Sequence, residues 1–134
     1  MHAIHTIPPS VIVIDEESMI VTMLIVALDA AGYCPVVGPM NGSAYTFIQA
    51  HQPAAVLLDV EMPNLDGIDL AKALQADPAM TNLPVFLMTG APWKLEQRFP
   101  DYAQNGVHLL TKPFMINQLL TMLQEKISTP PALH

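Results

Sequence analysis

Short runs of hydrophobic residues alternate with longer segments of helical periodicity along the chain. The runs are rich in branched aliphatic side chains, and each has the length of a strand that is buried on both faces of a parallel sheet. These predicted strands cover residues 11–14, 34–37, 54–58, 84–88 and 107–111. The segments that follow them carry apolar residues three and four positions apart, as amphipathic helices do. These predicted helices cover residues 18–31, 43–51, 68–76, 93–104 and 115–127.

Five alternations of strand and helix predict the α/β class, with a doubly wound, five-stranded parallel sheet flanked by five helices. The 134 residues are enough for one domain, which we expect to cover residues 11–128. Residues 1–10 and 129–134 are expected to be tails. Pro100 lies inside the fourth helical segment, where it would interrupt the hydrogen bonds of a helix. We therefore expect this helix to be short or irregular.

The composition limits the functions that the chain can have. Five Lys and Arg against twelve Asp and Glu give a net charge of −7, so direct nucleic-acid binding is not expected. A hydrophobic content of 51% with 13% charged residues excludes an intrinsically disordered chain. The single Cys34 excludes a disulfide framework. The longest apolar stretch, 19–28, is about half the length of a membrane span, and no signal peptide is visible. We expect a cytoplasmic protein without membrane contact.

Charged or hydroxyl residues stand at the carboxyl ends of four predicted strands, where ligands bind to sheets of this kind. They are Asp15 with Glu16, Asp59, Thr89 and Lys112. Several carboxylates at one sheet edge repel one another. A divalent cation that prefers oxygen ligands, Mg²⁺ or Mn²⁺, would remove this cost. Lys112 supplies positive charge and Thr89 a hydroxyl donor, and both suit phosphoryl oxygens. The set indicates transfer of a phosphoryl group to a carboxylate.

Four motifs at these strand ends resemble those of a known family. They are VIVIDEES, LLDVEMPNLDG, FLMTG and TKPF. In order and spacing they resemble the receiver domain of two-component response regulators, over about residues 10–128. The resemblance implies a flavodoxin-like fold, as in CheY, and a phosphoprotein that signals through protein–protein contacts in a two-component system or phosphorelay.

The resemblance also implies a role for each matching acidic residue. Asp59 would be the phosphoacceptor, taking its phosphoryl group from a histidine kinase, a histidine phosphotransfer protein or a small phosphodonor. Asp15 and Glu16 would hold Mg²⁺ together with Asp59 and the backbone carbonyl of Glu61. Glu16 replaces the commoner Asp, which keeps the charge but adds a methylene group. Such a domain is not an enzyme in the usual sense, although it catalyses its own phosphorylation and dephosphorylation.

The remaining matches concern the switch after phosphorylation. Thr89 matches the switch hydroxyl, and Lys112 matches the lysine that contacts the phosphoryl oxygen. Pro113 is expected to follow a cis peptide bond. Leu109 stands where the family usually has a switching Tyr or Phe, so the usual threonine–aromatic readout is not expected. Pro100 interrupts the helix that many relatives use for dimerisation, so output through that helix is disfavoured.

The predicted helix 18–31 is apolar on almost all sides, which is typical of a helix that is covered on both faces. Its expected core face consists of Ile20, Met23, Leu24, Ala27 and Leu28. Its expected outer face carries Met19, Val21, Ile25 and Val26. The resemblance places the docking of histidine kinases and phosphotransfer proteins on this helix. We expect the outer face to pack against such a partner or against a second copy of the chain in a homodimer.

Two other functions stay open from the sequence. A pseudo-receiver would bind partners without accepting phosphate. Leu109 and the irregular fourth helix keep this alternative open, but the complete set of acidic residues, Thr89 and Lys112 argues against it. A phosphohydrolase of the haloacid dehalogenase type also starts from an Asp at a strand end. However, it uses a second Asp two residues later, where this chain has Glu61, and it carries its nucleophile on the first strand. No effector domain is expected after residue 128. The chain would be a stand-alone regulator, a relay shuttle, a phosphate sink or a domain of a longer protein.

Overall fold

The computed structural model describes residues 7–127. Residues 1–6 of the predicted N-terminal tail and the whole predicted tail 129–134 lie outside this range, so those expectations stay predictions. Within residues 7–127 no helix has the length and apolar character that crossing a membrane requires.

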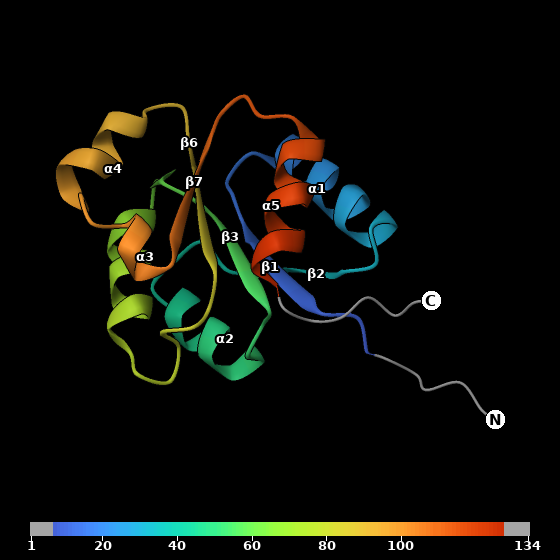
Figure 1. Cartoon of the computed structure of the whole chain (residues 1–134), viewed down its shortest axis with the longest axis horizontal. Helices are drawn as coiled ribbons and strands as arrows, with labels where there is room; N and C mark the ends of the chain where they lie inside the picture. Colours follow the sequence, from blue (N-terminus) through green and yellow to red (C-terminus); the bar gives the residue numbers. More distant parts are fainter. Residues whose placement is uncertain (1–6, 128–134) are drawn as a thin grey trace.

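Five strands form one parallel sheet at the centre of the molecule (Figure 1). They are β1 (Ser10–Ile14), β2 (Cys34–Val37), β3 (Ala55–Asp59), β6 (Val85–Thr89) and β7 (Val107–Thr111). Their order is β2-β1-β3-β6-β7, and all neighbouring pairs run parallel. The predicted sheet is confirmed. The direction of strand addition reverses between β1 and β3, which is the point where sheets of this type bind ligands.

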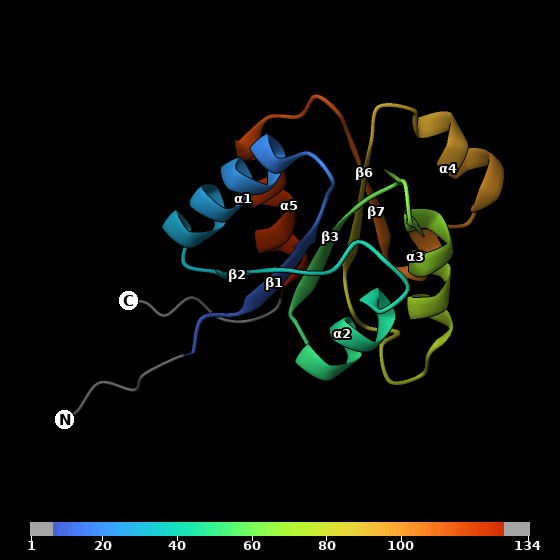
Figure 2. The ribbon, with the colours of Figure 1, turned by 180° about the vertical axis from the view of Figure 1, so that it is seen from behind.

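Helices cover both faces of the sheet. They are α1 (Ser18–Ala30), α2 (Ala44–His51), α3 (Gly67–Ala76), α4 (Pro92–Arg98) and α5 (Ile116–Lys126). α1 and α5 lie on one face, and α2, α3 and α4 lie on the other, as the two opposite views show (Figures 1 and 2). The chain therefore has the doubly wound architecture that its strand–helix alternation predicts.

The sheet separates two hydrophobic cores. Because successive strand residues point to opposite faces, Val11 and Val13 of β1 pack on the side of α1 and α5, where they meet Leu24. Ile12 and Ile14 pack on the other side, with buried side chains of α2 and α3. Burial on both faces explains why these strands are hydrophobic at every position and could be predicted from the sequence.

The fourth helix is short, as predicted. α4 ends at Arg98, two residues before Pro100, and the chain continues through a 3₁₀ turn at Ala103–Asn105 into β7. Leu95 and Phe99 are buried and attach α4 to the core.

A small antiparallel hairpin follows β3, in a segment for which the sequence predicts neither a strand nor a helix. It consists of β4 (Glu61–Met62) and β5 (Leu65–Asp66). Glu61 and Asp66 are direct partners across it. Each strand has two residues, which are too few to show the alternation by which strands are recognised.

The side of α1 that faces the core differs from the predicted one. Leu24 and Leu28 are buried and Ile20 packs beside them, as expected, but Met23 is 40% exposed. Val21, which was expected on the outer face, packs against the core. The prediction was wrong at Met23 and Val21 because a helix that is apolar on almost all sides has no polar face to define its rotation.

Candidate functional site

Asp15 and Asp59 lie at the carboxyl ends of neighbouring strands. Asp59 is the last residue of β3, and Asp15 directly follows β1, which pairs with β3. Both residues are almost completely buried, with 4% and 3% of their surface exposed. The carboxylate of Asp15 also accepts a hydrogen bond of 2.8 Å from the backbone N–H of Glu17, which fixes its orientation in the turn before α1.

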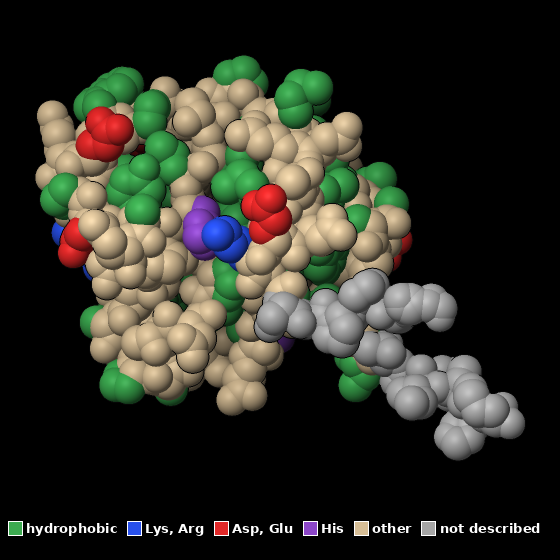
Figure 3. All heavy atoms as spheres, in the orientation of Figure 1, with side chains coloured by type: hydrophobic (Ala, Val, Ile, Leu, Met, Phe, Trp, Pro, Cys, Tyr) green, Lys and Arg blue, Asp and Glu red, His purple; other side chains and the backbone are tan. Residues whose placement is uncertain are grey.

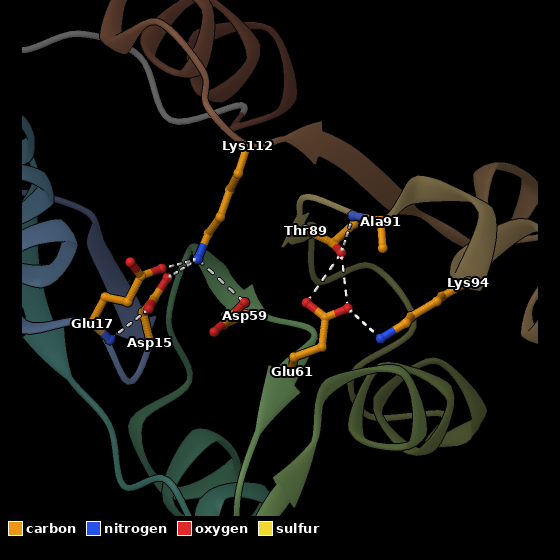
Figure 4. Close-up of polar contacts among 8 residues, drawn as sticks. All are labelled: Asp15, Glu17, Asp59, Glu61, Thr89, Ala91, Lys94 and Lys112. Atoms are coloured by element: carbon orange, nitrogen blue, oxygen red, sulfur yellow. Dashed lines mark hydrogen bonds and ion pairs between the residues drawn. The ribbon is translucent and has the colours of Figure 1, made fainter.

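The ammonium group of Lys112 lies among three carboxylates (Figure 4). Its Nζ is 2.9 Å from Oδ2 of Asp15, 3.3 Å from Oδ1 of Asp59 and 3.0 Å from Oε1 of Glu17. The backbone N–H of Lys112 donates to the carbonyl of Thr89, and the peptide bond to Pro113 is cis, as predicted. Lys112 thus neutralises buried negative charge at the switch point of the sheet.

Burial and charge shift the pKa values of this group. Burial, followed by the negative charge of Asp15, raises the pKa of Asp59 from 3.8 to about 6, although Lys112 acts in the opposite direction. Burial by itself lowers the pKa of Lys112, but the hydrogen bonds to Asp15 and Glu17 outweigh it and raise that pKa above its ordinary value. The lysine therefore stays positively charged, while the ionised form of Asp59 is destabilised.

Thr89, the last residue of β6, is completely buried and its hydroxyl group is fully engaged. It donates to Glu61, at 3.2 Å from Oε1 and 3.3 Å from Oε2. The same oxygen accepts the backbone N–H of Ala91 at 2.9 Å. On its other side Glu61 forms an ion pair of 2.9 Å with Lys94 of α4 (Figure 4).

Gly67 packs closely against the backbone of Asp59 and Val60. A Cβ atom at Gly67 would lie 2.2 Å from the carbonyl oxygen of Asp59 and 2.9 Å from Cα of Val60. The N–H of Gly67 donates to the carbonyl of Val60 at 3.1 Å. The start of α3 is therefore packed directly on the peptide that carries Asp59, and only glycine fits there.

The donor atoms at this edge suit a hard divalent cation. The carboxylates of Asp15 and Asp59 are oxygen donors with mutual repulsion, which a cation would relieve. Glu16 is exposed and lines, with Glu61, a groove of about 420 Å³ beside the site. Within residues 7–127 no three side chains of His, Cys, Asp or Glu already converge as a metal cage, and the Lys112 ammonium stands between Asp15 and Asp59.

The structure brings the predicted site residues together in two groups. Asp15, Asp59 and Lys112 contact one another directly, whereas Thr89 contacts Glu61. Two contributors were missed by the sequence reasoning, Glu17 and Lys94. Glu17 directly follows the predicted acidic pair, so its charge was visible in the sequence. The sequence did not show that its side chain points toward Lys112. Lys94 gave no signal, because its partner Glu61 belongs to the unpredicted hairpin.

Leu109, which stands at the position compared above with a switching Tyr or Phe, contacts the hydrophobic core. Leu109 lies on β7, is partly buried and packs against the core on the side of α2 and α3. It adds apolar contact there and has no polar group to offer to the site.

The outer face of α1 is partly as predicted. Met19 and Val26 are 84% and 64% exposed, and Ile25 is half-buried, whereas Val21 belongs to the core. Hydrophobic side chains also reach the surface on the α1 side of the molecule in Figure 3, where few charged groups appear. α1 therefore keeps a narrower apolar stripe than the sequence predicts.

Comparison with known sequences gives a consistent match over most of the chain. The sequence profile of the response regulator receiver domain matches residues 11–124. The phosphate regulon transcriptional regulatory protein PhoB of Pseudomonas aeruginosa is 28% identical over 115 residues, covering 86% of this chain and 50% of that protein. The probable transcriptional regulatory protein TcrX of Mycobacterium tuberculosis is 30% identical over 117 residues, covering 87% and 49%. The chain spans about half the length of these curated relatives.

Solved structures match the fold. A sensor protein from Polaromonas has a TM-score of 0.78 at 22% identity, covering 89% of this chain and 95% of that chain. The receiver domain of a sensor histidine kinase from Pseudomonas aeruginosa, described with a magnesium ion coordinated in its active site cleft, has a TM-score of 0.76 at 21% identity, covering 92% and 100%. These similarities confirm the predicted flavodoxin-like architecture.

Proposed function

Because the chain belongs to the response regulator receiver domain family, a family of signalling domains in two-component systems, we propose that Asp59 accepts a phosphoryl group. The donor is the phosphohistidine of a histidine kinase or of a histidine phosphotransfer protein, or a small acyl phosphate. The observation that carries the proposal is the contact of Lys112 with both Asp15 and Asp59 at the switch point of the sheet. The domain then signals through protein–protein contacts.

The chemistry is an in-line displacement at phosphorus. An oxygen of the ionised Asp59 forms a bond to phosphorus while the bond to the donor nitrogen breaks, and the leaving imidazole keeps the electron pair and takes up a proton. Negative charge is spread over the equatorial phosphoryl oxygens in the transition state. The Lys112 ammonium, held in place by Asp15 and Glu17, is positioned to stabilise that charge without moving far.

A divalent cation completes this account. Mg²⁺ or Mn²⁺ would be held by Asp15, Glu16, Asp59 and the backbone carbonyl of Glu61, and it would neutralise the incoming phosphoryl group. The oxygen donors of the site support this assignment. So does the magnesium ion described for the receiver domain of the Pseudomonas aeruginosa sensor histidine kinase.

The experiment that tests the proposal is the intact mass of the protein after incubation with acetyl phosphate, with Mg²⁺ or with EDTA. The wild type is expected to gain one phosphoryl group in Mg²⁺ alone, and Asp59→Asn is expected to gain none. A folded wild type that neither gains the group nor releases phosphate from acetyl phosphate would contradict the proposal and favour a pseudo-receiver. Hydrolysis of unrelated phosphomonoesters would instead favour the phosphohydrolase.

The partner proposed for α1 is the helical bundle of a histidine kinase or histidine phosphotransfer protein in the cytoplasm. Met19 and Val26 lie seven residues apart, about two turns, on the exposed side of α1. Two-turn spacing of apolar side chains is how one helix packs along another. A homodimer through the same stripe is the alternative, and sedimentation of the purified protein distinguishes the two.

A further inference from the structure

The hydroxyl group of Thr89 has one proton, which it donates in a hydrogen bond to the carboxylate of Glu61. A threonine hydroxyl can donate one hydrogen bond at a time, and here the proton is shared between the two carboxylate oxygens of Glu61 at 3.2 and 3.3 Å. A phosphoryl oxygen accepts hydrogen bonds and does not donate them, so the lone pairs of the Thr89 hydroxyl cannot bind it. Only the hydroxyl proton of Thr89 can make that contact. Thr89 can therefore donate to a phosphoryl group on Asp59 only after it leaves Glu61.

Glu61 is also the point at which the site is joined to α4. Lys94, in the first turn of α4, forms the 2.9 Å ion pair with Glu61, and the chain of contacts Thr89–Glu61–Lys94 is seen directly in Figure 4. The second basic residue of α4 lies one turn later. Arg98 binds Asp66 through two hydrogen bonds of 2.9 and 3.0 Å and Asp69 through a third.

The two anchors of α4 are not equivalent. Glu61 and Asp66 are paired across the β4–β5 hairpin, so Lys94 and Arg98 hold α4 to the two strands of one small element. The Arg98 pair is bidentate and also supports the N-terminus of α3, where Asp66 caps the helix. The Lys94 pair has a single contact, and its side chains, at 41% and 42%, are as exposed as those of the Arg98–Asp66 pair, at 40% and 41%, so the two anchors differ in the number of contacts. Half-exposed pairs of this kind contribute little to stability.

A phosphoryl group on Asp59 would compete for both partners of Glu61. It brings strong acceptor oxygens for the Thr89 hydroxyl and negative charge that repels Glu61 and attracts Lys94. Asp59 already senses the charge of Glu61, which contributes to the rise in its pKa. We propose that Glu61 and Lys94 are positioning residues that retain the Thr89 hydroxyl before phosphoryl transfer and couple the state of Asp59 to the first turn of α4.

This inference rests on the proposed function, since it needs a phosphoryl group on Asp59. When the group arrives, Thr89 turns from Glu61 to the phosphoryl oxygen, and the Lys94 contact is weakened or redirected. The Arg98 contacts hold the far end of α4, so the change is concentrated at Pro92–Lys94. Trp93 lies in this turn, is 56% exposed and is the single tryptophan of the sequence. Its fluorescence therefore reports on the proposed movement.

The test measures Trp93 fluorescence and phosphoryl mass gain in the same samples, with acetyl phosphate and Mg²⁺. The variants are Glu61→Ala and Lys94→Met, with Lys94→Arg as the conservative rescue. Lys126→Met is the matched control, because it removes an equal charge from an exposed residue at the end of α5. We expect the wild type, Lys94→Arg and Lys126→Met to show the same fluorescence change per labelled molecule. In Glu61→Ala and Lys94→Met the change should fall to less than about half.

The possible outcomes distinguish a failure of the proposed function from a failure of the inference about Glu61 and Lys94. A folded wild type that neither gains mass nor releases phosphate from acetyl phosphate would contradict the proposed function and this inference with it. Full labelling without a fluorescence change in the wild type would overturn the inference alone. Full labelling with the same change in all variants would also overturn it, because α4 would then respond to Asp59 without Glu61 and Lys94.

Discussion

The ammonium group of Lys112 lies 3.3 Å from Oδ1 of Asp59, and this contact joins the ends of β7 and β3, which are not neighbours in the sheet. The same ammonium reaches Asp15 at the end of β1. Side-chain exposure is 15% for Lys112, 0% for Asp15 and 4% for Asp59. One cation thus balances two buried anions and stabilises their ionised forms.

Replacing Lys112 by Met should slow labelling by acetyl phosphate about 100-fold, the effect that removal of a transition-state donor has in enzymes. It should also lower the free energy of unfolding by about 3–5 kcal/mol at neutral pH in EDTA, because the buried Asp15 and Asp59 lose their counterion. Mass spectrometry and urea unfolding measure the two effects. Lys126→Met is the control for charge alone. A Lys112→Met protein that labels at the wild-type rate would refute the role assigned to this lysine.

Asp59→Asn should stabilise the metal-free protein above pH 6 and not below pH 4. The folded state raises the pKa of Asp59 from 3.8 to about 6, so it binds the proton more tightly than the unfolded state does. This contribution to stability is complete below 3.8 and is lost as the pH rises to about 6. With allowance for solvent screening, the variant should gain about 1–2 kcal/mol at neutral pH. Urea unfolding in EDTA at both ends of the window measures it. An equal difference between variant and wild type at both pH values would contradict the prediction.

Gly67→Ala should destabilise the protein by about 2–3 kcal/mol and reduce labelling of Asp59. The added Cβ would meet backbone atoms of Asp59 and Val60, which cannot move aside as a flexible side chain could. Gly42→Ala is the matched control, because nothing lies within 4 Å of a Cβ at that position. Thermal unfolding and the labelling rate are compared for the two variants. Equal stability of the two would show that α3 does not pack on Asp59 as described.

Lysine at Met19 or Val26 should slow phosphotransfer from a histidine partner about tenfold or more while labelling by acetyl phosphate stays unchanged. A small donor needs no contact with α1, whereas a protein partner would have to bury a charge in an apolar interface. Ile7→Lys is the control, since Ile7 is an exposed apolar residue, at 86%, outside α1. Transfer at the wild-type rate in both α1 variants would exclude this stripe as the docking surface.

The sheet could be predicted because burial on both faces requires a hydrophobic side chain at nearly every strand position. Val11 to Ile14 are apolar without interruption, and each side chain has a defined core to enter. The Glu61–Asp66 hairpin could not be predicted, since two-residue strands carry no period. The predicted orientation of α1 was wrong at Met23 and Val21. Almost every position of this helix is apolar, so the sequence does not show which side faces the core.

The candidate site was predictable where strand ends fix the position of a side chain. Asp15, Asp59 and Lys112 meet because parallel strands end at the same edge of the sheet. The pair of Glu61 and Lys94 depends instead on how a hairpin and a short helix approach each other in space, which the sequence does not encode locally. The contact between Glu61 and Lys94 is therefore visible in the structure alone.

The central claim, that Asp59 receives the phosphoryl group, is tested most directly by chemical mapping. Borohydride reduces an aspartyl phosphate to homoserine, so the modified residue can be found by peptide sequencing after treatment with acetyl phosphate and Mg²⁺. The account predicts homoserine at position 59 in the wild type, and none when Mg²⁺ is replaced by EDTA. Unchanged Asp59 in a protein that carries the phosphoryl group elsewhere would contradict it.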